Sequence, residues 1–276
     1  MARTLTSNGK PLTGPGRLAR RAFDRVGPYV TIGALLIAWE LAARFEIVIA
    51  FLLPPLSVVL ARIAEDALSG QLPLDIAITL YRTVVAFGLA AAVGVSLGIL
   101  ISRVASIRWF FDPLISIGLP MPKIALLPIF MLWFGLFDLS KILMVAFSAS
   151  FQIVIATWAA TQAVEKELIW SAQSLGANRR DILREVILPA AMPQIMTGLQ
   201  IAMPICLIVV LITEMIMGGQ GLGDSMLRSA RYVDSPGVFA GIVEIGVLGF
   251  CVIKAMEYIR RRLLAWHPET HTGTTV

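Results

Sequence analysis

Charged side chains are scarce in this chain, and three long stretches have none. Only 15% of its 276 residues are charged, against 57% hydrophobic residues, and the mean hydropathy is +0.81. Residues 83–102, 142–164 and 186–213 contain no Asp, Glu, Lys or Arg. Each of these runs is long enough to cross a hydrocarbon core of ~30 Å. The composition therefore excludes a soluble globular domain and indicates an all-α, polytopic membrane protein.

Side chains that carry redox, metal or nucleophilic chemistry are also few. The two cysteines, Cys206 and Cys251, lie inside apolar runs without metal-ligand spacing, so we expect them to be small core residues. The two histidines, His267 and His271, lie in the C-terminal tail. We therefore expect no catalytic residues and no metal site. An intramembrane enzyme would need such side chains within its spans.

A nucleotide-binding loop is missing as well. The sequence has no Gly-x-x-x-x-Gly-Lys-Ser/Thr, and its glycine cluster at 218–223 (GGQGLG) follows no strand, so we interpret the cluster as a tight external turn. We expect no enzyme activity and no cofactor on this chain. The net charge of +5 is spread over loops without interleaved aromatic residues, which disfavours nucleic-acid binding. The positive-inside rule explains this charge better.

The apolar runs and their breaks predict about six spans in one transmembrane domain, residues 28–262. Residues 1–27 are basic and are predicted to form a disordered cytoplasmic tail, and residues 263–276 form a second cytoplasmic tail. Ser57 is expected to cap a short amphipathic helix on the outer surface. Basic residues are concentrated in the segments that this topology places inside, so both termini are predicted to be cytoplasmic. The predicted spans are 28–48, 75–102, a broken one within 109–137, 140–163, 192–217 and 236–259.

The third span is interrupted by prolines. Pro120, Pro122 and Pro128 each remove a backbone donor, and lipid cannot satisfy the carbonyl groups that they free. The segment must therefore face protein or a watery cavity. Residues 124–137 give only about 21 Å of helix at ~1.5 Å per residue, so Lys123 is expected near the inner interface. One interpretation is an ordinary proline kink. The other is that the segment lines a translocation path, with Ala125 and Trp133 beside it.

Two glutamates in apolar surroundings are further candidates for the path. Glu214 lies near the outer end of the fifth span, where it could contact a substrate or cap backbone amides of the glycine turn. Glu244 lies near the middle of the last span, where a charge is costly and a functional role is the default hypothesis. The alternatives for Glu244 are a hydrogen bond to a neighbouring helix or a protonated carboxyl group. Glu40 and Arg44, one turn apart in the first span, are expected to pair.

A polar stretch between two apolar runs, residues 168–189 (LIWSAQSLGANRRDILREVILP), predicts a helix–turn–helix, which we call the elbow. Gly176 can take the positive φ that ends the first helix, and Asn178 with Asp181 forms the N-terminal cap of the second. Pro189 is expected to close the second helix. The first helix has an apolar face, and the elbow has a basic outer side. On spacing alone, a helix lying on lipid headgroups is equally compatible with this pattern. The apolar face consists of Leu168, Ala172 and Leu175, and the basic side of Arg179, Arg180 and Arg184.

The elbow resembles the EAA loop of ABC-importer permeases. Ser171-Ala172, Gly176 and residues 186–189 (VILP) match that motif with its spacing, although Trp170 stands in place of its Glu and Ser171 in place of its first Ala. The chain also resembles the nitrate/taurine/sulfonate branch of these permeases, in residues 120–128 (PMPKIALLP), 132–135 (LWFG), Ser140-Lys141, Trp39-Glu40 and 266–268 (WHP). The resemblance covers most of residues 30–268.

The resemblance implies a homodimeric permease of the bacterial cytoplasmic (inner) membrane that imports a small anion. It implies two ATPase subunits that carry ATP and Mg²⁺, and a periplasmic or lipoprotein substrate-binding protein. The alternative is a secondary transporter or channel that ATP does not drive, for which repeated halves would be typical. The residues that the resemblance assigns to ATPase coupling are Leu168, Ser171, Ala172, Leu175, Gly176, Arg179, Arg180 and Pro189.

Overall fold

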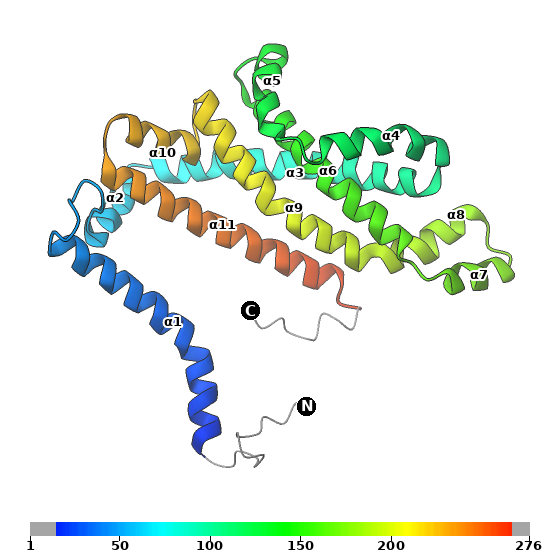
Figure 1. The fold of residues 1–276 in the computed structure, drawn as a ribbon, viewed down its shortest axis with the longest axis horizontal. Helices are drawn as coiled ribbons and strands as arrows, with labels where there is room; N and C mark the ends of the chain where they lie inside the picture. Colours follow the sequence, from blue (N-terminus) through cyan, green and yellow to red (C-terminus); the bar gives the residue numbers. More distant parts are fainter. Residues whose placement is uncertain (1–14, 267–276) are drawn as a thin grey trace.

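The computed structural model describes residues 15–266, which form helices joined by short loops (Figure 1). The all-α prediction is confirmed, since no strand occurs in these residues. A 3₁₀ turn at Lys123–Leu126 precedes α5, and a π-helical turn at Ile182–Ile187 joins α8 to α9. The helices are α1 (Pro15–Arg44), α2 (Leu56–Leu68), α3 (Gln71–Arg103), α4 (Ala105–Gly118), α5 (Leu127–Phe134), α6 (Asp138–Gln162), α7 (Lys166–Ser174), α8 (Arg179–Asp181), α9 (Leu188–Met217), α10 (Leu222–Arg231) and α11 (Ser235–Leu263).

Helices α3, α6 and α9 pack into the core because α3 presents small residues to α6. A Cβ atom on Gly94 would lie 2.7 Å from the Cβ of Ile153, and one on Gly98 would lie 2.7 Å from the Cβ of Thr157. Such close backbone approach is how helices associate tightly in lipid, where apolar burial gives little driving force. Cys206 is buried in this core, as predicted, whereas Cys251 is exposed on α11 and the core prediction for it was wrong.

Helices α10 and α11 cover the other side of α9, and α2 ties α1 to this layer. Leu207 and Leu211 of α9 pack against Leu222 of α10 and Leu248 of α11. Trp39 of α1 contacts the segment before α2, since its Nε1 donates to the Pro54 carbonyl at 3.0 Å.

The start of α2 differs from the prediction for Ser57. Pro55 occupies the N-cap, and Ser57 lies inside the first turn, where its backbone N–H donates to the Glu40 carboxylate at 3.1 Å. Ser57 is therefore not the cap; the carboxylate of another helix satisfies this amide. Glu40 also pairs with Arg44 at 2.6 Å, as predicted.

In the part of the chain that the structure describes, four helices are long and apolar enough to span a membrane, where about six spans were predicted for the whole chain. They are α3, α6, the continuous helix Arg179–Met217 and α11. A fifth arises if α4 and Lys123–Phe134, which are bent by 97°, form one broken span. Helix α1 covers most of the first predicted span, 28–48, and ends at Arg44.

The boundaries of several helices also differ from the predicted ones. Helix α1 begins at Pro15, inside the segment 1–27 that was expected to be disordered. The fifth predicted span begins at Arg179 rather than at residue 192. Residues 1–14 and 267–276, which include His267, Pro268, His271 and most of the C-terminal tail, lie outside the described residues.

Candidate coupling and translocation sites

The elbow turns through a helix C-cap built on Gly176. Its φ is +85°, as the sequence predicted. Its N–H donates to the Gln173 carbonyl at 2.9 Å, and the N–H of Ala177 donates to the Ala172 carbonyl at 3.1 Å. These two bonds make a Schellman motif, which requires a left-handed residue at this point. The sequence folds this way because glycine adopts that conformation without steric cost.

The second half of the elbow begins with the predicted capping box. The Asn178 side chain accepts from the N–H groups of Arg180 and Asp181, at 2.8 and 3.1 Å. In return, the Asp181 carboxylate accepts from the Asn178 N–H at 3.1 Å. The cap therefore fixes the angle between α7 and the helix that follows it. Two apolar residues of the following turn, Ile182 and Ile187, are buried and anchor it to the bundle.

The prediction that Pro189 closes the helix was wrong. Pro189 lies in the first turn of α9, and the helix continues from Arg179 to Met217. The π-helical turn at Ile182–Ile187 ends two residues before the proline. Its wider i→i+5 spacing accommodates a residue that has no N–H and would crowd a regular α-turn. The elbow is therefore the start of a membrane-spanning helix.

Helix α7 lies against little of the chain, and none of its residues is buried. Leu175 is 89% exposed, and Leu168 and Trp170 are 46% and 57% exposed, whereas Ala172 is half-buried. Ser171, Arg179, Arg180 and Arg184 are exposed as well. The elbow thus presents apolar and basic side chains together, at the end of the bundle where α7 and α8 extend outward (Figure 1).

The broken segment makes a sharp corner. Helix α4 ends at Gly118, the chain turns through Pro120 and Pro122, and α5 then runs at 97° to α4, away from the bundle (Figure 1). Pro128 was expected to interrupt a helix, but this prediction was wrong. It lies in the first turn of α5, where its missing N–H costs nothing. The predicted path residues of this segment, Pro120, Pro122, Ala125, Pro128 and Trp133, are all exposed.

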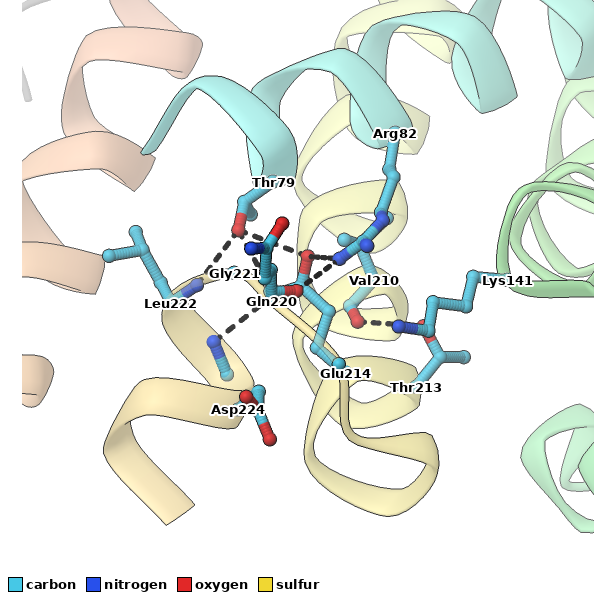
Figure 2. Close-up of polar contacts among 12 residues, drawn as sticks. Thr79, Arg82, Lys141, Val210, Thr213, Glu214, Gln220, Gly221, Leu222 and Asp224 are labelled. Atoms are coloured by element: carbon cyan, nitrogen blue, oxygen red, sulfur yellow. Dashed lines mark hydrogen bonds and ion pairs between the residues drawn. The ribbon is translucent and has the colours of Figure 1, made fainter. Parts of the chain in front are cut away.

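The glycine loop at the opposite end of α9 is held by a buried polar cluster (Figure 2). Glu214, which is fully buried, accepts from the guanidinium of Arg82 at 2.7 Å and from the N–H of Gly223 at 3.1 Å. The hydroxyl of Thr79 donates to the same carboxylate at 3.0 Å and accepts from the N–H of Leu222 at 3.0 Å. Glu214 therefore does cap backbone amides of the turn.

The same cluster extends to both sides of the loop. The N–H of Gly221 donates to Asp75 at 3.0 Å, and Lys141, which is 2% exposed, donates to the Gly218 carbonyl at 2.6 Å. Arg82 bridges to Asp138 at 2.6 Å. Gly221 has φ +118°, and a Cβ atom there would overlap the Glu214 carboxylate. These contacts leave Glu214 no exposed surface for a substrate in this conformation.

Glu244 is placed differently from Glu214. It lies within α11 and is half-buried, and its Oε1 atom is buried without a hydrogen-bond partner among residues 15–266. The proposed hydrogen bond from that oxygen to a neighbouring helix is therefore not made here. A buried oxygen without a partner fits a residue that is satisfied by something else, such as a substrate, water or a second copy.

The comparisons with known proteins agree with this arrangement. A family model described as "Binding-protein-dependent transport system inner membrane component" matches residues 85–265, which include both the broken segment and the elbow. The chain belongs to this family. It is thus a membrane permease of the ABC-importer class, as the resemblance implied.

Curated relatives cover nearly the whole permease. The taurine transport system permease protein TauC of Escherichia coli is 31% identical over 244 residues, which is 87% of this chain and 89% of that protein. A putative aliphatic sulfonates transport permease protein, SsuC of Bacillus subtilis, is 31% identical over 84% of this chain and 85% of its own length. The formylaminopyrimidine transport permease protein ThiX of Halalkalibacterium halodurans is 31% identical, over 90% of this chain and 98% of that protein.

Solved structures share the fold. An inward-facing conformation of the MetNI methionine ABC transporter aligns with a TM-score of 0.55 at 17% identity, covering 69% of this chain and 98% of that one. A crystal structure of an amino acid ABC transporter with histidines also gives 0.55, at 21% identity, covering 71% of this chain and 97% of that one.

Sequence reasoning missed most of the buried cluster around the glycine loop. Arg82 and Lys141 lie within the predicted spans 75–102 and 140–163, and both are buried against α9 and its loop. A signal was present: Asp75, Thr79 and Arg82 recur at three- and four-residue spacing, which places them on one face of a helix. Charged residues aligned at the end of an apolar helix indicate a polar partner inside the protein.

Proposed function

We propose that this permease forms, as a homodimer, the translocation path of an ATP-driven importer for a small anion such as a sulfonate, taurine or nitrate. The names of the taurine and sulfonate permeases support the substrate class, and ThiX indicates that relatives also carry heterocycles. A second copy is supported by α5, which leaves the bundle with Leu132 and Trp133 83% and 68% exposed. A two-fold axis would let two such copies enclose a path.

The elbow is the observation that carries the proposal. A short exposed helix with apolar side chains is joined, through a Schellman motif and a capping box, to a helix that crosses the membrane. Because both ends of this joint are fixed by hydrogen bonds, a displacement of α7 is transmitted to the membrane-spanning helix. Two ATPase subunits, which bind ATP and Mg²⁺, would dock on the elbows of the two copies and switch access between the two sides. This chain itself needs no cofactor and no nucleic acid.

The topology that goes with this proposal places the elbow and both termini in the cytoplasm of a bacterial cell, with the chain in the inner membrane. The glycine loop then faces the outside. A periplasmic or lipoprotein substrate-binding protein would deliver substrate there. The excess of basic residues in the segments assigned to the inside supports this orientation.

Ala172→Glu tests the docking. Ala172 is half-buried between exposed apolar neighbours of α7, and a docked ATPase would bury an unpaired carboxylate there. We expect the variant to reach the membrane but to lose ATPase copurification and at least about tenfold of ATP-dependent uptake, a free-energy change of about 1.4 kcal/mol. Ala163→Glu, at an exposed position between α6 and α7, is the matched control and should behave as wild type.

The alternative, a secondary transporter or channel, predicts the opposite result. Uptake would then follow an ion or substrate gradient without ATP, and Ala172→Glu would leave it unchanged. A helix that merely lies on lipid headgroups predicts normal uptake as well. Normal copurification and uptake in Ala172→Glu would therefore reject the coupling role.

A further inference from the structure

Lys123 lies at the corner where the broken span turns. Helix α4 contributes 14 residues before that corner, which is about 21 Å of helix from its start. The end of α4 meets the middle of α6 (Asp138–Gln162), because a Cβ atom on Gly118 would overlap the ring of Phe151. The corner is therefore well inside the ~30 Å apolar layer, and not near the inner interface where the sequence had suggested Lys123 would be.

The ammonium group of Lys123 is only partly satisfied. It donates to the Leu119 carbonyl at 3.1 Å and lies 5.1 Å from the centre of the Phe151 ring. No carboxylate lies within ion-pair distance of it in the part of the chain that the structure describes. An ammonium has three donors, so donors remain for another group. Its side chain is half-buried, which leaves part of it accessible.

The other cations buried in the bundle have local partners. Arg82 pairs with Glu214 and Asp138, and Lys141 donates to the Gly218 carbonyl within the same acidic cluster. These contacts explain why two buried cations are tolerated. Lys123 has no comparable partner that would explain why its charge is tolerated. A charge at this depth is costly, and such a residue is usually functional.

Aromatic rings continue from Lys123 toward α5. Phe151 contacts Phe147, with ring centres 5.2 Å apart, and Phe147 contacts Phe130 at 5.8 Å. Phe130 in turn contacts the exposed Trp133 at 6.4 Å. The corner therefore combines one ammonium with an apolar, polarizable wall. A small anion with a short apolar tail has the matching chemistry: its oxygens accept from an ammonium, and its tail packs on rings.

We propose that Lys123 is the specificity-determining residue of the path, whose ammonium binds the anionic group of the substrate midway across the membrane. This inference rests on the proposed function, because it names the group that selects the anion. A purely structural role is the competing explanation: Lys123 would only satisfy the Leu119 carbonyl that the proline corner leaves free.

Charge and hydrogen bonding can be separated by substitution. Lys123→Gln retains an N–H donor but removes the charge, whereas Lys123→Arg retains the charge. Arg108→Gln is the matched control, because Arg108 also lies over a ring of α6, 5.2 Å from the centre of Trp158. Arg108 lies in the first turn of α4 and is exposed, where water screens its charge.

The experiment measures ATP-dependent uptake of taurine, ethanesulfonate and nitrate by proteoliposomes that contain the permease with its ATPase and binding protein. We expect Lys123→Gln to lower anion uptake at least about tenfold, with normal assembly and normal ATPase copurification. Lys123→Arg should stay within about threefold of wild type, and Arg108→Gln within about twofold.

Two results would overturn the inference and leave the proposed function standing: wild-type uptake by Lys123→Gln, or an equal loss in Arg108→Gln. The wild-type arm tests the proposed function separately. If the wild-type complex transports none of the three anions, the anionic substrate class is rejected, and the role of Lys123 with it.

Discussion

Replacing Gly176 by valine should uncouple transport from ATP hydrolysis without preventing membrane insertion. Gly176 has φ +85°, and a Cβ atom there would meet nothing within 4 Å. The cost of a side chain is therefore backbone strain alone, about 1–2 kcal/mol for a residue held in the left-handed region. Open space lets the chain relieve that strain by redirecting α7. The elbow would then occupy its docking geometry about five- to thirtyfold less often.

Gly70 supplies an unusually close control. It also has a left-handed φ, +80°, with nothing within 4 Å of an added Cβ atom, but it lies between α2 and α3, far from the elbow. Gly70→Val thus introduces the same kind of strain elsewhere. Membrane levels, thermal stability, ATPase copurification and uptake would be measured for both variants.

Gly176→Val should lose at least about fivefold in uptake and in ATPase copurification, the lower end of the range that the strain sets. Gly70→Val should remain within about twofold of wild type in both assays. If both variants lose uptake equally, the effect is general destabilisation and not coupling. Normal uptake by Gly176→Val would refute the reasoning directly, because the left-handed turn would then not matter for function.

Two further predictions concern orientation and stability. In a Cys251→Ser background, a cysteine that replaces Arg179 should be labelled only from the cytoplasmic side. A cysteine that replaces Gln71 should be labelled only from the outer side. Labelling of both from the same side would contradict the proposed topology. Glu214→Gln should lower the thermal midpoint in detergent strongly, because it removes the buried one of the two carboxylates that pair with the Arg82 guanidinium, a loss of about 3–5 kcal/mol. Asp138→Asn, at a carboxylate that is 52% exposed, should cost about 1 kcal/mol or less, and equal midpoints for the two would show that the Glu214 pair does not stabilise the fold.

The elbow could be predicted from the sequence because its determinants are local. Gly176 ends one helix by its own conformational freedom, and Asn178 and Asp181 cap the next through bonds that span three residues. None of these interactions depends on the rest of the fold. The same is true of Glu40 and Arg44, which pair one turn apart on α1.

The buried cluster could not be predicted in the same way, because its partners are distant in sequence. Arg82 and Glu214 are separated by 132 positions, and only the packing of α3 against α9 brings them together. Proline gave two further errors, at Pro128 and Pro189. The rule that it ends a helix holds between Gly118 and Lys123 but fails at Pro189, where a π-helical turn lets the helix continue. Rules that consider only a residue and its neighbours in sequence do not predict that a π-helical turn compensates for a proline.

The continuous helix from Arg179 to Met217 has a mechanical consequence. It is 39 residues long, about 58 Å at ~1.5 Å per residue, and it carries the elbow at one end and the Glu214 cluster at the other. A rod of that length that tilts by about 5° around one end moves its other end by about 5 Å, roughly the height of one helical turn. The buried ion pair between Arg82 and Glu214 holds the end of the rod at the glycine loop. A small rotation at the elbow end therefore reaches the glycine loop as a displacement large enough to break hydrogen bonds of about 3 Å, and the stiffness of this one helix determines how much of that displacement is transmitted.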